Sequence, residues 1–83
     1  MVLRTTVMRK AFVLVNVELG ADDEVESALK KIQPAVGVYQ VYGVYDLVVE
    51  VSAASDKELK DVIFSMIRSL NHVKSTLTLS VVE

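Results

Sequence analysis

The sequence predicts a single α+β domain in which a four-stranded antiparallel sheet carries two helices on one face. Length sets the first limit, because 83 residues enclose one hydrophobic core and leave no room for a second. Hydrophobic residues make up 52% of the chain, and Val alone occupies 17 positions. This favours sheet, because β-branched side chains pack well on a pleated surface. Hydrophobic periodicity then gives the order strand, helix, strand, strand, helix, strand.

The first strand and the first helix are separated by a glycine. Gly20 ends the strand, and the acidic run Asp22–Glu24 suits the start of a helix, where free amide groups attract negative charge. Pro34 ends that helix. We expect the strand to run from about Arg9 to Leu19, with one fully apolar face formed by Ala11, Val13, Val15, Val17 and Leu19.

A hairpin is expected in the middle of the chain. Two strand-like runs, Val36–Tyr42 and Tyr45–Ser52, meet at Gly43-Val44. A glycine there supplies the backbone angle that a tight β-turn requires, so the two strands pair antiparallel. Every second residue of the later run shares one apolar face, formed by Leu47, Val49 and Val51.

The second helix has the clearest boundaries of any element. Ser55 followed by Glu58 forms a capping box, and Asn71 can adopt the left-handed conformation that closes a helix. Between them, apolar residues recur at helical spacing: Leu59, Val62, Ile63, Met66, Ile67 and Leu70. In the last strand, uninterrupted alternation divides the residues into two faces, Val73, Ser75, Leu77, Leu79 and Val81 on one and Lys74, Thr76, Thr78, Ser80 and Val82 on the other.

This βαββαβ order is that of a ferredoxin-like fold, in which both helices cover the same sheet face and the other face stays bare. An apolar bare face marks an interaction surface, and two copies can pack face to face as a dimeric α+β barrel. The sequence therefore predicts at least a homodimer. We expect the bare face to present Phe12, Leu14, Tyr39, Val41, Val48 and Val82, interspersed with Asn16, Glu50, Thr76 and Thr78.

Composition excludes several classes of partner. The 11 Asp and Glu residues outnumber the 9 Lys and Arg residues, for a net charge of −2, which argues against direct nucleic-acid binding because such binding depends on a basic surface. No apolar run approaches the roughly 18 residues of a membrane span, and the first residues do not form a signal peptide. We therefore expect a cytoplasmic protein without membrane contact. The chain has no Cys, so no disulfide or Cys-based metal site is expected.

Residues suited to catalysis or metal binding are sparse. His72 is the one histidine, and its place between a helix and a strand favours a connecting role. Helix capping explains Asp22, Asp23 and Glu24, and no second oxygen-rich segment lies at a recognisable spacing from them. No glycine-rich phosphate loop is present. We expect no catalytic residues, no metal and no cofactor.

The segment Tyr42–Val49 is the most informative about function. Its simplest interpretation is a turn in which Gly43 permits the bend and Asp46 accepts hydrogen bonds from turn amides. A functional interpretation adds a ligand, because a free amino acid needs a carboxylate for its ammonium and amide or hydroxyl donors for its carboxylate. Thr76 and Thr78 could add hydroxyls from a neighbouring part of an assembly, although Thr is common in strands without any ligand.

The element order and several segments resemble the effector-binding and oligomerisation (RAM) domain of Lrp/AsnC regulators. The segments are Ala11–Val15, Val41–Val49, Ile67-Arg68 and Val73–Leu79. The resemblance covers residues 8–83, after a short extension of residues 1–7. It implies domains that pair through their sheets, dimers that assemble further, and amino acids that bind between dimers near the G-x-Y-D turn. The effector contacts implied for this sequence are Gly43, Val44, Tyr45 and Asp46, with Thr76 and Thr78 as partners.

Members of that family carry a helix-turn-helix domain before the RAM domain, and residues 1–7 are too few for one, so the sequence predicts a stand-alone form. We expect a non-enzymatic sensor of small molecules, in particular amino acids, linked to transcription regulation. It would form homo-oligomers and could join a full-length Lrp/AsnC regulator.

Two alternatives to a sensor remain open. One is a structural partner-binding module, since Phe64 lies off the apolar stripe of the second helix and is a candidate interface residue. The other is a small cofactor-free enzyme of the dimeric α+β barrel type, which would rely on Glu50 and His72 as titratable groups.

Overall fold

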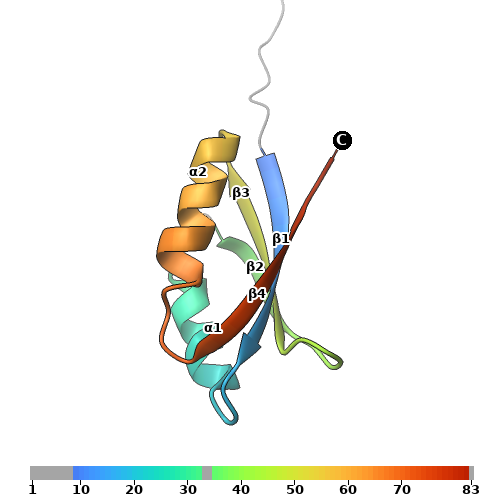
Figure 1. Cartoon of the computed structure of the whole chain (residues 1–83), viewed down its shortest axis with the longest axis vertical. Coiled ribbons are helices and arrows are strands. Elements are labelled where there is room, and N and C mark those ends of the chain that lie inside the picture. Colours follow the sequence, from blue (N-terminus) through green and yellow to red (C-terminus); the bar gives the residue numbers. More distant parts are fainter. Residues whose placement is uncertain (1–8, 33–34, 83) are drawn as a thin grey trace, which may run out of the picture.

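The computed structural model describes residues 9–32 and 35–82 and contains the predicted βαββαβ order (Figure 1). The strands follow each other in the sheet as β2-β3-β1-β4, and every neighbouring pair is antiparallel. The ferredoxin-like α+β prediction is confirmed, whereas the predicted extension of residues 1–7 and the start of the domain at Met8 lie outside the described residues. The elements are β1 (Arg9–Val17), α1 (Asp22–Lys30), β2 (Ala35–Gln40), β3 (Leu47–Ala53), α2 (Asp56–Val62), the π-helical turn η1 (Ile63–Ile67) and β4 (Val73–Ser80).

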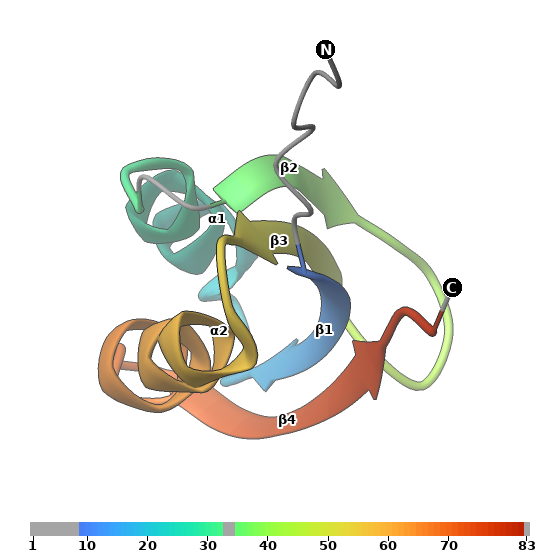
Figure 2. The same ribbon diagram turned by 90° about the horizontal axis from the view of Figure 1, so that it is seen from above.

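Both helices cover the same face of the curved sheet, and no helix or strand of residues 9–32 and 35–82 lies on the opposite face (Figures 1 and 2). The buried core lies between these two layers. The alternation of apolar residues in the sequence predicts the buried core well in the central strands, because every second residue of β1 and β3 from Ala11 onwards is buried. Leu19 is an exception, since β1 ends at Val17 and leaves this side chain fully exposed in the connection to α1. The buried strand residues are Ala11, Val13, Val15, Val17, Leu47, Val49, Val51 and Ala53.

The connection between β2 and β3 is longer than the tight turn that the sequence predicts. The strands end at Gln40 and resume at Leu47, and the backbone amide of Val41 donates to the carbonyl oxygen of Asp46 at 2.9 Å, which closes the base of a wide loop. Gly43 has a φ of 127°, a conformation that side chains with a Cβ rarely adopt. Figures 1 and 2 show that this loop, residues 41–46, projects on the side of the sheet away from the helices.

A β-bulge in β4 breaks the predicted alternation. Val17 of β1 pairs with Val73, but the next residue, Asn16, pairs with Ser75, so Lys74 is the extra residue. An inserted residue turns every later side chain of a strand to the opposite face. The bulge is a feature of the pairing between two strands, and for this reason the pattern within β4 alone does not reveal it.

The bulge makes part of the predicted bare face wrong. Thr76 and Thr78 pair with Val15 and Val13, whose side chains are fully buried beneath the helices, so both threonines lie on the helix side. Val82 follows the end of β4 and is also misplaced by the uninterrupted alternation. The open face instead receives two leucines, in the pairs Leu14 with Leu77 and Phe12 with Leu79.

The second helix begins as predicted and then changes its pitch. The hydroxyl of Ser55 accepts from the amide of Glu58 at 3.2 Å, and the carboxylate of Glu58 accepts from the amide of Ala54, also at 3.2 Å, which confirms the capping box. In η1 the amide of Arg68 donates to the carbonyl of Ile63 at 2.9 Å, an i to i+5 bond that widens the turn. Met66, predicted on the buried stripe, is therefore 47% exposed.

Among the described residues, the structure contains no helix that is both long and apolar enough to cross a membrane.

Candidate functional site

Asp46 ties the β2–β3 loop to the end of β1. Its carboxylate oxygen Oδ2 accepts from the backbone amide of Val17 at 2.9 Å, and its own backbone amide donates to the carbonyl of Val15 at 3.0 Å. The second carboxylate oxygen, Oδ1, has no hydrogen-bond partner within the part of the chain that the structure describes. The half-buried Asp46 therefore fixes the loop with one oxygen and presents the other as an acceptor.

The rest of the G-x-Y-D segment exposes apolar groups. Tyr42 and Val44 flank Gly43 and have almost no contact with the rest of the domain, whereas Tyr45 is half-buried beside Asp46. Large apolar side chains on a loop that projects from the open face favour contact with another molecule. The loop thus combines a free carboxylate oxygen, exposed backbone and two exposed apolar side chains.

Thr76 and Thr78 do not join this loop within one copy of the chain. Both belong to the helix side of β4, whereas the loop projects from the open side. Thr76 is half-buried, and Thr78 is exposed in a groove beside α2. The six predicted effector contacts therefore fall into two groups, the loop residues Gly43 to Asp46 and the two threonines, on different sides of the sheet.

The open face holds most of the predicted interface residues. Phe12, Leu14 and Val48 are half-buried in the centre of the sheet, and Tyr39 is exposed beside Val48 on β2. Val41 lies just beyond β2, at the base of the loop. The sequence pattern missed Leu77 and Leu79, which are 44% and 49% exposed and extend the apolar surface across β4.

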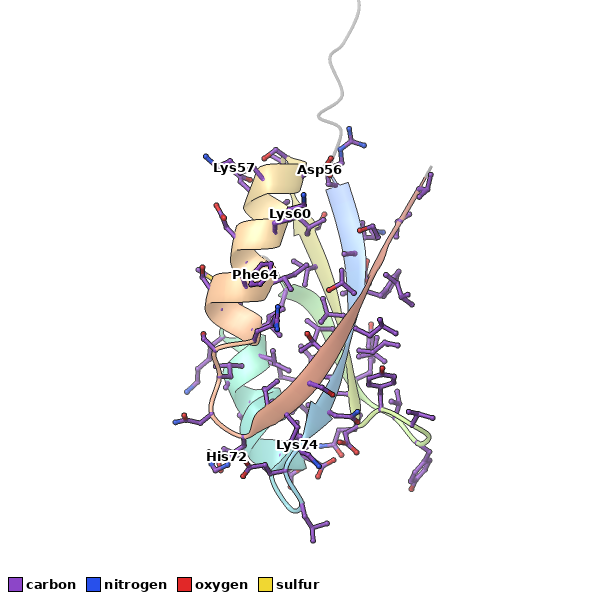
Figure 3. The ribbon with its side chains drawn as sticks, in the orientation of Figure 1. Asp56, Lys57, Lys60, Phe64, His72 and Lys74 are labelled. Carbon is purple, nitrogen blue, oxygen red and sulfur yellow. The ribbon has the colours of Figure 1, made fainter. Side chains whose placement is uncertain are left out.

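Polar contacts bound the open face. The ammonium of Lys10 pairs with the carboxylate of Glu50 at 3.2 Å, and the Asn16 side chain donates to the Ser75 hydroxyl at 3.4 Å. Glu50, one of the two titratable groups that an enzyme would use, is therefore engaged in an ion pair. Phe64 is 62% exposed, which confirms its predicted place off the core stripe, but it lies on the helix layer and not on the open face (Figure 3).

His72, the other such group, connects two loops at the far end of the domain. It adopts the left-handed conformation, with a φ of 72°, that the sequence assigns to Asn71. Its Nδ1 lies 3.0 Å from the carboxylate of Glu18 and its Nε2 lies 3.3 Å from that of Glu24. The hydrogen bond with Glu18, followed by the charge of Glu24, raises the pKa of His72 above its ordinary value. These contacts give the histidine a structural role.

A groove runs between α2 and β4, and no sequence motif predicts it. Its volume is about 740 Å³, and its walls come from the start of β1, from α2 and η1, and from the end of β4. Side chains that lie far apart in the sequence meet there, which is why no local motif reveals it. The residues that line this α2–β4 groove are Arg9, Lys10, Asp56, Leu59, Lys60, Ile63, Phe64, Thr78, Ser80, Val81 and Val82.

Acidic and histidine side chains do not gather into a metal centre in residues 9–32 and 35–82, where no group of three or more is placed to hold an ion. Instead, Lys10 pairs with Glu50, and His72 lies between Glu18 and Glu24.

The fold and the loop define a class of small α+β domains in which a loop projects beside a bare sheet face. The family model described as the Lrp/AsnC ligand binding domain matches residues 10–83, and the chain belongs to that family. The family is one of transcriptional regulators and not of enzymes.

Curated relatives and solved structures agree with this assignment. The chain is 36% identical over 73 residues to the HTH-type transcriptional regulator FL11 of Pyrococcus furiosus. These residues make up 88% of this chain and 48% of that protein. The chain thus spans about half the length of the curated relatives it matches. It is 33% identical to TTHA0845 from Thermus thermophilus, with a TM-score of 0.86 over 90% of this chain and 94% of that one. Escherichia coli AsnC shares the fold, with a TM-score of 0.85 at 20% identity over 90% of this chain and 51% of its own.

Proposed function

We propose that this domain is a non-enzymatic sensor of amino acids that also assembles into oligomers and serves transcription regulation. The observation that carries the proposal is the free Oδ1 of Asp46 on a loop anchored to β1. A solved structure of similar fold, 13% identical to this chain, is the transcriptional regulator NMB0573 of Neisseria meningitidis in complex with L-Met. It supports an amino acid as the class of ligand.

A free amino acid matches the chemistry of the loop. Its ammonium would donate to Oδ1 of Asp46, and its carboxylate would accept from backbone amides near Gly43 and Val44, where the backbone is exposed. Because Thr76 and Thr78 lie on the other side of the sheet in the same copy, their hydroxyls would reach the ligand from a neighbouring copy. The site would then be complete only in an assembly, which couples ligand binding to oligomerisation.

The open face supports assembly as a dimer. Its apolar centre, formed by Phe12, Leu14 and Val48, is only half-buried in one copy, and Leu77 and Leu79 extend it to the edge of the sheet. Packing two such faces together would remove these side chains from water and form a sheet sandwich. Glu50 lies opposite Phe12 on the two central strands, so its charge would enter the interface already compensated by Lys10.

Calorimetric titration with each proteinogenic amino acid tests the binding half of the proposal. We expect at least one ligand, and we expect Asp46→Asn to weaken it by about ten- to hundredfold, because loss of a charged hydrogen bond costs about 1.5–3 kcal/mol. Asn keeps an oxygen that can accept from the Val17 amide, so the loop should remain in place. Asp56→Asn, the same change on α2, is the matched control and should bind normally. Absence of binding by every amino acid would refute the sensing function.

Sedimentation velocity tests the assembly half. We expect the unmodified chain to sediment as a dimer or larger species, and Leu79→Lys to shift it towards the monomer because an ammonium would be buried between two apolar faces. Leu19→Lys introduces the same charge on a fully exposed loop residue and should leave the assembly unchanged. A monomer at micromolar concentration for the unmodified chain would contradict the proposal.

We also propose that the domain associates with full-length Lrp/AsnC regulators in the cytoplasm, since its curated relatives are helix-turn-helix regulators about twice the length of the matched region. The relevant surface would be the same open face, shared by two members of one family. Mixing the chain with a tagged full-length regulator of this family should give a complex that Leu79→Lys prevents. A complex that forms equally well with Leu79→Lys would place the contact elsewhere.

A further inference from the structure

The α2–β4 groove exists because the edge strand turns small polar side chains towards the helices. The bulge at Lys74 places Thr78 and Ser80 on the helix side, and Leu77 and Leu79 on the open side. Their short side chains do not fill the space between β4 and α2, and no hydrogen bond occupies either hydroxyl within the described residues. A strand in this position usually contributes apolar side chains to the core. The groove is therefore lined on one wall by free hydroxyl groups.

The opposite wall combines a cation with an apolar surface. Lys60 lines the groove from α2, and no carboxylate in residues 9–32 and 35–82 forms an ion pair with its ammonium. Leu59 and Ile63 are almost fully buried at the base, and the exposed Phe64 ring forms the rim. Figure 3 shows Lys60 reaching from α2 towards the strands, whereas Lys57, one turn earlier, extends away from them.

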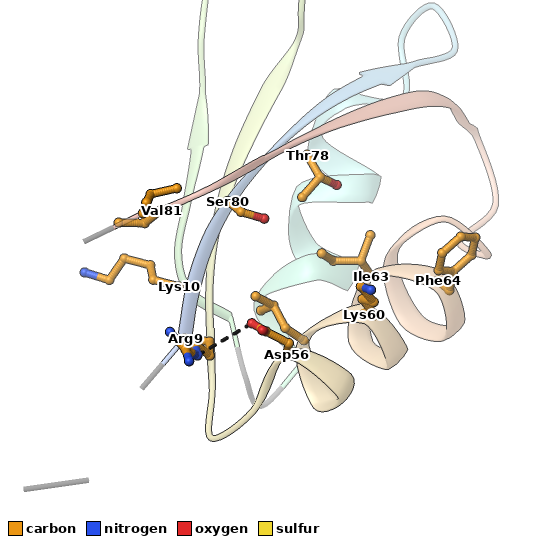
Figure 4. Close-up of a pocket in the computed structure, with 11 residues that line it drawn as sticks. Arg9, Lys10, Asp56, Lys60, Ile63, Phe64, Thr78, Ser80 and Val81 are labelled. Carbon is orange, nitrogen blue, oxygen red and sulfur yellow. Dashed lines mark ion pairs between the residues drawn. The ribbon is translucent and has the colours of Figure 1, made fainter. Parts of the chain in front are cut away.

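The charges at the end of the groove leave an excess of one cation. The guanidinium of Arg9 lies 3.6 Å from the carboxylate of Asp56 (Figure 4), so these two charges compensate each other. The ammonium of Lys10 is occupied by Glu50 on the open face. Lys60 therefore remains as the uncompensated charge of the groove, in a chain whose net charge is −2.

From these features we propose that the α2–β4 groove is a second ligand site, distinct from the β2–β3 loop, that binds a small organic carboxylate with a compact apolar chain. The carboxylate would pair with Lys60 and accept from the hydroxyls of Thr78 and Ser80, which reach across from β4 (Figure 4). The apolar chain would lie against Ile63 and Phe64.

The size and the lining of the groove fit this class of ligand. A volume of about 740 Å³ falls within the range of about 300–1,000 Å³ that is usual for small-molecule sites, which combine an apolar lining with a few convergent polar groups. The single excess cation favours a monoanion over a zwitterion, since the ammonium of a free amino acid would be repelled by Lys60 and would have to displace Arg9 from Asp56. The loop and the groove thus select different ligands, one through a carboxylate and the other through an ammonium.

Amide chemical-shift titration of the intact chain tests the second site directly. The probe is 4-methylpentanoate at millimolar concentrations, with two comparison compounds, the uncharged 4-methylpentanamide and the zwitterion leucine. We expect saturable shifts at Lys60, Phe64 and Ser80 with 4-methylpentanoate, and none that saturate at these three residues with the amide or with leucine. The shifts should leave residues 43–46 unaffected.

Two substitutions on the same helix give matched variants. Lys60→Gln keeps most of the side-chain length without the charge and should weaken 4-methylpentanoate binding by about fivefold, the value of one partly exposed ion pair. Lys57→Gln removes an equal charge outside the groove and should change nothing. Ser80→Ala removes a hydroxyl that belongs to the groove alone and should also weaken binding.

Three results would overturn the proposal. They are shifts of equal size with the amide, shifts confined to the loop or absent from the groove, and equal weakening by the two lysine variants. These outcomes are independent of amino-acid binding at the loop, because Asp46→Asn should weaken amino-acid binding there and should leave 4-methylpentanoate binding in the groove unchanged. If the titration refutes one of the two proposed sites, the other site is still tested by its own titration.

Discussion

Replacing Asp46 by Ala removes the only acceptor that the described residues offer to the Val17 amide at the end of β1. Val17 is almost fully buried, and its amide donates to Oδ2 at 2.9 Å. A buried donor left without a partner costs about 1–3 kcal/mol. Because Asp46 is only half-buried, water can replace part of the lost bond, and we expect Asp46→Ala to lower the free energy of unfolding by about 1–2 kcal/mol.

Asp46→Asn separates the hydrogen bond from the charge. The amide oxygen of Asn can still accept from Val17, so we expect a loss of only about 0.5 kcal/mol. Backbone bonds of residue 46 to Val15 and Val41 are unchanged in both variants. Val44→Ala, on the same loop but exposed, is the control and should stay within about 0.5 kcal/mol of the unmodified chain.

Urea denaturation followed by circular dichroism measures these free energies, at one protein concentration because assembly contributes to the apparent stability. In a thermal melt, a loss of 1 kcal/mol corresponds to about 4–8 °C for a domain of this size. If Asp46→Ala behaved like Val44→Ala, the Asp46 carboxylate would not hold the loop. If Asn and Ala were equally destabilising, the charge and not the hydrogen bond would be the stabilising feature, and the use of Asn as a binding variant would fail.

Two further predictions concern the far end of the domain and the π-helical turn. The pKa of His72 is raised in the folded state by Glu18 and Glu24, so the stabilisation of the fold by protonated His72 is complete below the ordinary histidine pKa of about 6.5 and is lost as pH rises through the higher folded value. His72→Asn, which tolerates the left-handed backbone, should abolish this fall in melting temperature with pH. An unchanged pH profile in the variant would contradict the ion-pair role of His72. Ile67 is fully buried and Met66 is half-exposed, so Ile67→Ala should lower the free energy of unfolding by about 2–5 kcal/mol and Met66→Ala by less than about 1 kcal/mol, as measured by urea denaturation. Comparable losses in the two variants would mean that the helix continues in α-helical register.

The central strands and the helix starts could be predicted because local chemistry determines them. Alternation in β1 and β3 reflects one covered and one open face, and the capping box at Ser55 and Glu58 satisfies amides within its own turn. Prediction failed where pairing or packing between elements decides the geometry. The bulge at Lys74 depends on how β4 meets β1, and the exposure of Met66 depends on the wider turn of η1.

Of the two candidate sites, the sequence could predict the one formed by a single contiguous segment and not the one formed between elements. The G-x-Y-D segment is contiguous, so the sequence could single out Gly43 and Asp46. The predicted hydrogen bonds from turn amides to Asp46 are wrong in their partner, because the carboxylate accepts from the Val17 amide at the end of β1. The groove could not be found from the sequence, since its walls come from three regions of the chain. Its hydroxyl wall also depends on the bulge, which turns Thr78 towards α2.

The native mass of the assembly, measured by sedimentation velocity with and without a mixture of amino acids, tests most directly whether this domain couples ligand binding to oligomerisation. We predict at least a dimer without ligand, a larger or more stable assembly when the amino acids are added, and no response in Asp46→Asn. A monomer in both conditions, or a response that persists unchanged in Asp46→Asn, would contradict the proposed sensing function.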